Sequence, residues 1–351
     1  MKTVRVSASK EYEVLIGTGL FATAGERLRA LMPKCGKAAV ISDDNVAPLY
    51  LERLKKSLSA AGFECISFVF PHGEASKNAE NYIKILNFLA ANKMTRSDMV
   101  IALGGGVVGD ISGFAAATYL RGISYVQIPT SLLAMVDSSV GGKTAIDLDE
   151  GKNLAGAFCQ PELVLCDLDC LETLSPAFFT DGCAEVIKYG ILNDAELFKH
   201  LREHGQDFER EYVVSRCVEM KRDYVCEDEF DTGVRRKLNL GHTVGHAIEK
   251  CSAYAVPHGS AVAIGMAIIA KCSAAKGLCS EACAAEIIEG IRALKLPLET
   301  DFSITQLLDP MLSDKKRNGA TVSFIVPKAI GDCDILPLPV GQIEEFVKAG
   351  L

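Results

Sequence analysis

Three of the six histidines of this chain lie close together in the sequence, at His242, His246 and His258. Because a spacing of four residues returns to the same helix face, His242 and His246 would point to one side of a helix. Imidazole pairs at this spacing are common metal ligands, and His258, just before a further helical stretch, could join them. The three residues therefore predict a divalent-ion site, with surface or helix-capping histidines as the alternative.

A catalytic ion site of this kind has three nitrogen or oxygen ligands from the protein and one or more open coordination positions, and one of the three ligands could be a carboxylate. The ligand could be Glu185, Glu249 or another carboxylate, and spacing alone does not choose among them. Cysteine ligands are not expected, because the thirteen cysteines contain no C-x-x-C pair. The residue types thus favour an ion held by nitrogen and oxygen.

A second chemical pattern is the stretch LGGGVVGD at 103–110, which follows an apolar run and precedes a helical one. Gly104, Gly106 and Gly109 satisfy G-x-G-x-x-G, in which backbone N–H groups at a helix N-terminus bind a pyrophosphate. The expected ribose-binding acid is missing about 20 residues further on. Asp43, after an earlier strand-like run, is a candidate for that role and is equally a helix cap. The stretch predicts a dinucleotide site, with a turn that binds nothing as the alternative.

Cationic side chains lie near these glycines and histidines although the chain as a whole is acidic. Its 37 Lys and Arg against 45 Asp and Glu give a formal charge of −8, so only local cations could attract an anion. The run GGKT at 141–144 resembles the end of a P-loop, but Asp137 stands where that motif needs glycine, which excludes such an ATPase. For any single cation, a solvated surface position is the alternative.

Composition excludes several other classes of protein. A chain with a pI of about 5.4 is not a generally basic nucleic-acid binder, and a hydrophobic share of 49% excludes disorder of its bulk. An odd number of cysteines without a framework, and no signal-type run in residues 1–9, predict a reduced, cytoplasmic protein. The longest apolar run, 261–270, is shorter than the roughly 18 residues of a membrane span, so we expect a buried helix.

The hydrophobic pattern predicts a scaffold in two parts. Up to about residue 167, apolar runs alternate with amphipathic stretches, as in a parallel sheet covered by helices. The runs are 37–42, 63–70, 99–103 and 124–129, and the stretches are 20–33, 46–61 and 78–93. Beyond about residue 170 helical stretches follow one another, with extended runs at 321–326 and 332–336. We expect an α/β nucleotide-binding domain at 1–169 and a mostly α-helical domain at 170–351.

Nine runs spread over nearly the whole chain form a recognisable set. They are GEASK (73–77), LGGGVVGD (103–110), TYLRG (118–122), IPTSLLAMVDSSVGGKTAID (128–147), GKNLAGAF (151–158), GCAEVIKYG (182–190), KLNLGHTVGHAIE (237–249), PHG (257–259) and DKK (314–316). In this order they resemble the 3-dehydroquinate synthase family of sugar-phosphate cyclases. Their combined length makes the resemblance specific.

The resemblance implies a dehydroquinate synthase-like fold with one NAD, one divalent metal ion, zinc or else cobalt, and a homodimer. It implies a phosphate-eliminating lyase of the shikimate pathway, which leads to chorismate and the aromatic amino acids. The substrate would be 3-deoxy-D-arabino-heptulosonate 7-phosphate. Transient oxidation by NAD, phosphate elimination, re-reduction and an intramolecular aldol closure would give 3-dehydroquinate. No nucleic-acid or membrane partner is expected.

Carried over residue by residue, the resemblance makes Glu185, His242 and His258 the metal ligands and His246 a substrate contact. The residues implied to bind NAD are Asp43, Asn45, Glu74, Lys77, Gly105, Gly106, Val107, Asp110, Thr130, Ser131, Lys143, Lys152, Cys170, Leu171, Glu172 and Thr173. The residues implied to line the substrate pocket or to handle protons are Asp137, Lys143, Asn153, Lys188, Lys221, Arg235, Asn239 and one of Lys315 and Lys316, with Arg121 donated by the other subunit.

The chain departs from the family pattern at two places. Residues 175–178 read SPAF where the family commonly has a proline and an Arg-Glu pair, so Phe178 replaces an acid on the nucleotide side. Ser131 replaces a threonine and keeps the hydroxyl. Neither change affects the metal or substrate residues.

Other functions remain open at this point. A cyclase of the same superfamily could act on a substrate without a carboxylate, and Lys221 and Arg235 argue against it because a carboxylate would explain these cations. A metal-dependent polyol dehydrogenase of the iron alcohol dehydrogenase type would accumulate NADH. A non-catalytic sensor of nucleotide or metal is disfavoured, because reactive side chains occupy every matched position.

Overall fold

The computed structural model describes residues 1–313 and 321–351, so the predicted substrate residues Lys315 and Lys316 lie outside the described residues. The described chain forms two compact units. The first comprises Met1–Leu174 and Arg210–Phe230, and the second comprises Ser175–Glu209 and Asp231–Leu351.

The first unit is built on a seven-stranded sheet with the order β1-β2-β9-β6-β5-β3-β4. Its strands are β1 (Lys2–Ser7), β2 (Glu11–Gly17), β3 (Lys37–Asp43), β4 (Glu64–Phe70), β5 (Met99–Gly104), β6 (Ser124–Pro129) and β9 (Leu163–Asp167). β1 pairs antiparallel with β2, and every other neighbouring pair is parallel. The central strands β5 and β6 are mostly apolar and are buried along nearly their whole length because helices cover the sheet, as the sequence predicts.

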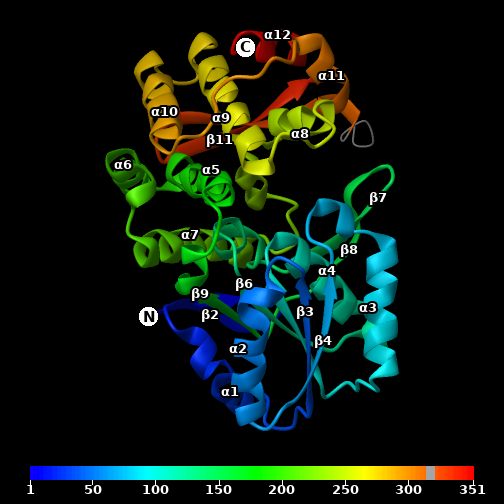
Figure 1. Ribbon diagram of the computed structural model, residues 1–351. Coiled ribbons are helices and arrows are strands. Elements are labelled where there is room, and N and C mark those ends of the chain that lie inside the picture. The colour runs from blue at the N-terminus through cyan, green and yellow to red at the C-terminus, as the bar shows by residue number, and fades with distance from the viewer. Residues whose placement is uncertain (314–320) are drawn as a thin grey trace. The chain divides into compact units, whose positions relative to one another are not determined.

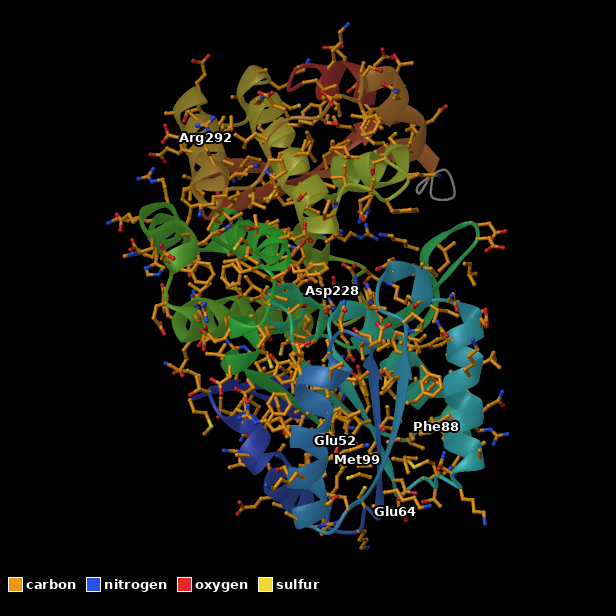
Figure 2. The ribbon with its side chains drawn as sticks, in the orientation of Figure 1. Glu52, Glu64, Phe88, Met99, Asp228 and Arg292 are labelled. Carbon is orange, nitrogen blue, oxygen red and sulfur yellow. The ribbon has the colours of Figure 1, made fainter. Side chains whose placement is uncertain are left out.

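Helices pack against this sheet and bury its apolar side chains (Figure 1). They are α1 (Leu20–Leu31), α2 (Ala47–Ala60), α3 (Ala79–Ala91) and α4 (Gly106–Thr118). Met99, at the start of β5, is fully buried, and Phe88 of α3 packs against the core cluster that includes Val100 of the same strand. Glu64, at the start of β4, is exposed, and Figure 2 labels Met99, Phe88 and Glu64. Some of the residues predicted to bind NAD lie at or directly after the carboxyl ends of β3, β5 and β6, namely Asp43, Gly105 and Thr130.

A small antiparallel hairpin, β7 (Lys143–Leu148) and β8 (Gly151–Phe158), is an element that the hydrophobic pattern does not indicate. It packs against α4 and projects from the α/β unit in Figure 1. Its strands are partly exposed, so its sequence lacks a long apolar run. Three predicted site residues lie on it, namely Lys143, Lys152 and Asn153.

Helix α7 (Arg210–Glu227) departs from the predicted division of the chain. Because α7 follows residue 170, the sequence predicts it in the helical domain. In the structure it packs against β1, β2 and the turn at Ala134–Ser138, all in the first unit. The first long segment of this unit also ends at Leu174 and not at residue 169. The reason is that an amphipathic pattern shows that a face is buried without showing which partner buries it.

The second unit is mostly helical. Its elements are α5 (Pro176–Asn193), α6 (Ala195–His204), α8 (His242–Cys251), α9 (His258–Ala275), α10 (Glu281–Ala293), α11 (Ile304–Ser313), α12 (Ile343–Lys348), and the strands β10 (Thr321–Ala329) and β11 (Asp332–Pro339), which form an antiparallel pair. α9 is central and packs against α5, α8, α10 and β10. By length and composition α9 could cross a membrane, but 72% of it is buried inside the protein, in agreement with the expected buried helix.

The backbones of α8 and α9 touch where both carry glycine. A Cβ added to Gly265 would lie 2.1 Å from the carbonyl oxygen of Gly241, and one added to Gly245 would lie 3.1 Å from Ala261. Side chains at these positions would force the helices apart. The glycines therefore set the distance between α8 and α9, the helices whose first residues are His242 and His258.

We predict that Gly265→Ala lowers the free energy of unfolding by about 1–3 kcal/mol, because the new methyl group must displace the Gly241 carbonyl. Urea unfolding followed by circular dichroism measures the change. Gly341→Ala is the control, since no heavy atom lies within 4 Å of a Cβ added there. Equal stability of the two variants would contradict the prediction.

Candidate active site

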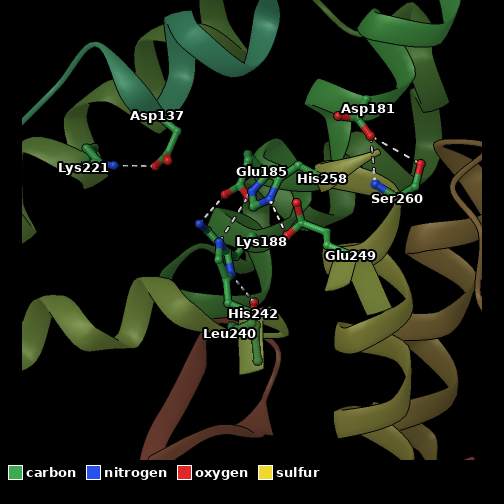
Figure 3. Close-up of polar contacts among 10 residues, drawn as sticks. All are labelled: Asp137, Asp181, Glu185, Lys188, Lys221, Leu240, His242, Glu249, His258 and Ser260. Atoms are coloured by element: carbon green, nitrogen blue, oxygen red, sulfur yellow. Dashed lines mark hydrogen bonds and ion pairs between the residues drawn. The ribbon is translucent and has the colours of Figure 1, made fainter. Parts of the chain in front are cut away.

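The second unit brings one carboxylate and two imidazoles to a common point (Figure 3). Glu185, on α5, is fully buried. Its Oε1 lies 3.5 Å from Nε2 of His242 and 3.3 Å from Nε2 of His258, the first residues of α8 and α9. Three helices thus contribute one donor atom each.

The outer nitrogen of each imidazole faces an acceptor. Nδ1 of His242 lies 3.1 Å from the carbonyl oxygen of Leu240, and Nδ1 of His258 lies 3.3 Å from Oε2 of Glu249. Both Nδ1 atoms can therefore donate a proton, so that the Nε2 atoms, which face Glu185, are the ones available to a metal ion. This is the arrangement in which histidines usually hold a metal ion.

The spacing of the three donors fits a divalent ion. Ligands at tetrahedral angles around zinc, with bonds of about 2.0–2.1 Å, lie about 3.3 Å from one another. The two measured separations, 3.5 and 3.3 Å, match this value. Two nitrogen donors and one oxygen donor suit zinc or cobalt, and three protein ligands leave room for a substrate oxygen.

The buried Glu185 carboxylate needs a positively charged partner. Glu185 forms an ion pair with Lys188, one turn further along α5, and Lys188 is also buried. Burial, together with the Lys188 charge, lowers the pKa of His242 to about 3, so that it is neutral. Burial would lower the pKa of His258, but Glu185 and Glu249 outweigh it and raise that pKa to about 10. A metal ion bound at Nε2 would replace the proton of His258.

Other predicted residues of this unit have different surroundings. His246 is exposed on α8, with its ring centroid 5.4 Å from that of His242. Its donor atoms also lie within 4.8 Å of donors of Glu249 and His258. Arg235 is 1% exposed and Asn239 is exposed, both in the helical turn Val234–Asn239.

In the first unit, the predicted pyrophosphate turn lies between β5 and α4. Gly105 precedes α4 and Gly106 and Val107 begin it, so the N–H groups of the first turn are directed out of the helix end. A Cβ on Gly104 would lie 2.5 Å from the Val108 side chain, so this position requires glycine. Thr130 donates its N–H to the Gly104 carbonyl at 3.0 Å and so joins β6 to the turn.

Lys77 is the centre of a buried ion network in the same unit. Its Nζ lies 2.8 Å from Glu74, 3.3 Å from Asp110 and 3.6 Å from Asp147. Burial alone would lower the pKa of Lys77, but the three carboxylates raise it far above its usual range. For Glu74, burial alone would raise the pKa of the carboxyl group, but the nearby Lys77 charge outweighs burial and lowers that pKa below its ordinary value. Asp147, which the sequence reasoning missed, also accepts the Asn153 N–H at 2.8 Å.

Several predicted nucleotide residues are held by local contacts. Asp43 accepts the N–H groups of Asn45 and Val46 at 3.0 and 2.9 Å, in the turn before α2, whose own capping residue Val46 makes no side-chain hydrogen bond. The Thr173 hydroxyl is hydrogen-bonded to Tyr50, and Glu172 pairs with Arg210. Cys170 and Leu171 are buried beside them, and Ser131 accepts the Ala134 N–H at 3.3 Å.

The predicted substrate residues of the first unit are partly paired. Asp137 lies 2.5 Å from Nζ of Lys221, which stands on α7 (Figure 3). Lys143 is exposed, and the charge of Lys152 contributes to the lowered pKa of Glu74. Asn153 and Arg121 both have a left-handed backbone, with φ of 57° and 68°, and both are exposed.

Two residues that the family resemblance does not name, Asp147 and Glu249, contact the predicted site residues. Asp147 completes the carboxylates around Lys77, and nothing in its spacing indicates this because the hairpin brings it there. Glu249, which the spacing left open as a metal ligand, contacts the outer nitrogen of His258 and belongs to a second possible ion-binding group with His246 and His258. Its spacing of seven from His242 places it on the same face of α8, which was the available signal.

Solved structures define the class of this fold. One, a 2-deoxy-scyllo-inosose synthase complexed with carbaglucose-6-phosphate, NAD+ and Co2+, has a TM-score of 0.89 at 22% identity and covers all of both chains. Another, a 2-epi-5-epi-valiolone synthase from Streptomyces hygroscopicus subsp. jinggangensis with NAD+ and Zn2+ bound, has a TM-score of 0.87 at 29% identity and covers 98% of each chain. An iron-containing alcohol dehydrogenase is more distant, with a TM-score of 0.69 at 14% identity. The fold is that of the dehydroquinate synthase-like cyclases, as expected.

Sequence comparison gives the family. Models described as 3-dehydroquinate synthase N-terminal and C-terminal match residues 67–181 and 182–317. The 3-dehydroquinate synthase of Streptococcus suis is 44% identical over 344 residues, which cover 96% of this chain and 97% of the relative. That of Clostridium acetobutylicum is 44% identical over 342 residues, covering 95% and 96%. The chain belongs to the 3-dehydroquinate synthase family, which confirms the resemblance and the expected enzyme function.

We predict that Asp110 makes stability fall with rising pH. Burial raises the pKa of its carboxyl group from an ordinary 3.8 to about 6, so between these values the folded protein retains a proton that the unfolded chain has lost. The Asp110 contribution to the free energy of unfolding therefore decreases from about pH 4 to about pH 6 and is constant above. Urea unfolding of wild type and Asp110→Asn across this range measures the difference.

Asp98→Asn is the control for this titration. Although burial raises the pKa of Asp98, the Thr95 and Lys37 N–H groups lower it below its ordinary value. The wild-type advantage over Asp98→Asn should therefore not fall between pH 4 and 6. A constant or rising advantage over Asp110→Asn would contradict the prediction.

Proposed function

We propose that this chain converts 3-deoxy-D-arabino-heptulosonate 7-phosphate into 3-dehydroquinate and phosphate, with a divalent ion held by Glu185, His242 and His258. The observation that carries the proposal is the buried Glu185 carboxylate, which faces Nε2 of both imidazoles at ligand spacing. Family membership supports the reaction, and this geometry supports the ion site.

The cofactors are NAD and one divalent ion, zinc or cobalt. The donor set fits such an ion, and the glycine turn before α4 with the Lys77 network offers the N–H groups and charges that a dinucleotide needs. The first unit would serve as the NAD-binding domain and the second as the ion-binding domain. When bound, the two groups supply a reversible oxidation at C5 that makes the neighbouring C6 proton acidic.

The protein's own residues position the substrate and move protons. Lys188, paired with Glu185, and Asp137, paired with Lys221, would hold and release protons, and these pairings support the proposal. The buried cations Lys221 and Arg235 would bind the substrate carboxylate, because hydrogen bonds between a charged donor and a carboxylate are strong. Lys143, Asn153, Asn239 and His246 would orient the phosphate.

We also propose that the active form is a cytoplasmic homodimer in which Arg121 of one subunit serves the other. Arg121 is exposed in a tight turn, where Leu120 and Arg121 both have a left-handed backbone. Sedimentation analysis of wild type and activity of mixed Arg121→Ala subunits would test this assembly.

We predict release of one phosphate per substrate without net formation of NADH. NAD is restored in each turnover, so a phosphate assay should respond to the heptulosonate phosphate while absorbance at 340 nm stays level. A chelator should abolish release, and added zinc or cobalt should restore it. Accumulating NADH would instead indicate a polyol dehydrogenase.

Sedoheptulose 7-phosphate is the control substrate, since it lacks the carboxylate. Release from it at an equal rate would contradict the assigned substrate and favour another cyclase of the superfamily. No release from either substrate would leave only a sensor of nucleotide or metal.

We predict that Glu185→Ala abolishes both ion binding and turnover while the protein stays folded. The substitution removes the only carboxylate in the described ion-binding trio and leaves two imidazoles, which bind divalent ions more weakly. Bound metal per chain, measured after dialysis, and circular dichroism test both parts. One tightly bound ion with normal activity would contradict the assignment.

A further inference from the structure

Helix α9 begins at the proposed ion ligand His258, and its first turn is not capped by its own preceding residue. Pro257 stands at the capping position and makes no side-chain hydrogen bond there. The first N–H groups of any helix lack partners within the helix and need an acceptor from elsewhere. Asp181 of α5 provides one, since its Oδ1 accepts the N–H of Ser260 at 2.8 Å and faces the Ser260 hydroxyl at 3.3 Å (Figure 3).

The backbones of α5 and α9 are in direct contact at the same point. A Cβ added to Gly259 would lie 1.9 Å from the carbonyl oxygen of Asp181. The start of α9 therefore rests directly on the backbone of α5. Asp181 holds this contact by a charge-assisted hydrogen bond, which the positive end of the α9 dipole strengthens.

Asp181 and Glu185 are four residues apart on α5, so they lie on the same face one turn from each other. Ser260 and His258 both lie in the first turn of α9, two residues apart. One helix thus contacts the other at two adjacent points, first between Asp181 and Ser260 and then between Glu185 and His258. Any movement of α9 that breaks the first contact changes the second.

We infer that Asp181 is a positioning residue for the ion, which it does not touch, and that it sets the separation of His258 and Glu185 through the start of α9. Asp181 is not a member of either possible ion-binding group in the described residues. This inference rests on the proposed function, because it assigns a role toward the same ion.

The test measures ion binding and coordination directly and does not need turnover. The probes are Co2+ and Zn2+ alone, with the visible spectrum of the cobalt protein reporting coordination and competition with a chromophoric chelator reporting affinity. Asp181→Ala should weaken binding by roughly 10–100-fold, the usual effect of losing support for a ligand, and should change the cobalt spectrum. Asp181→Asn keeps the acceptor oxygen and should restore wild-type spectrum and affinity.

Asp194→Ala is the matched control. Asp194 caps α6 in the same unit by accepting the Leu197 N–H at 3.0 Å, so its loss costs a similar helix cap away from the ion group. This variant should lose stability and keep the cobalt spectrum and affinity. If Asp181→Ala does not fold, Asp181→Glu replaces it, because the longer side chain must push α9 away and change the spectrum.

Each outcome decides the inference. Unchanged spectrum and affinity in Asp181→Ala or Asp181→Glu would overturn it while leaving the ion site intact. A loss of affinity in Asp181→Asn as large as in Asp181→Ala would show that charge acts and not position, and would also overturn it. If wild type binds neither ion, the proposed ion site fails and the inference fails with it.

Discussion

A carboxylate that has no contact with water is the constraint on which the second unit depends. Ionised Glu185 could not be buried without positive partners, because removing a charge from water costs several kcal/mol. Its partners are Lys188 on the same helix and two imidazoles, each at the start of another helix. The N-termini of α8 and α9 carry partial positive charge, which further favours an anion near them. The same contacts therefore stabilise the buried charge of Glu185 and position the helices that carry the proposed ion ligands.

Small residues make this arrangement rigid. Gly259 brings α9 against the backbone of α5, and Gly265 brings it against Gly241 at the start of α8. Because these contacts are between backbones, no side-chain rotation can relax them. The donor atoms consequently stand on helices whose separations are fixed before an ion arrives, and such preorganisation is what a tight, selective site requires.

The first unit buries a positively charged side chain, Lys77, where the second unit buries a negatively charged one. Lys77 is 4% exposed and is held by three carboxylates from α4, the hairpin and the turn before α3. The network joins segments that are distant in the sequence and carries a local negative excess, which suits contacts to ribose hydroxyls. The N–H groups at the start of α4 supply the positive end for a pyrophosphate. An acidic chain can therefore bind an anionic dinucleotide, because binding depends on local groups and not on net charge.

Local pattern was sufficient for many features of this protein. Apolar runs predict the strands that became β3, β4, β5 and β6, and the spacing of His242 and His246 predicts their common helix. The glycine stretch predicts the turn between β5 and α4. These features are local, because strand and helix periodicity and the backbone freedom of glycine act over a few residues.

Tertiary structure alone decided the rest. Spacing left Glu185 and Glu249 equivalent, and the packing of α5 and α8 against α9 placed Glu185 near both Nε2 atoms and Glu249 near Nδ1 of His258. It also brought α7 to the sheet and Asp147 to Lys77. The physical reason is that a sequence pattern shows which face of an element must be buried, whereas the partner that buries it is selected by contacts between segments far apart in the chain.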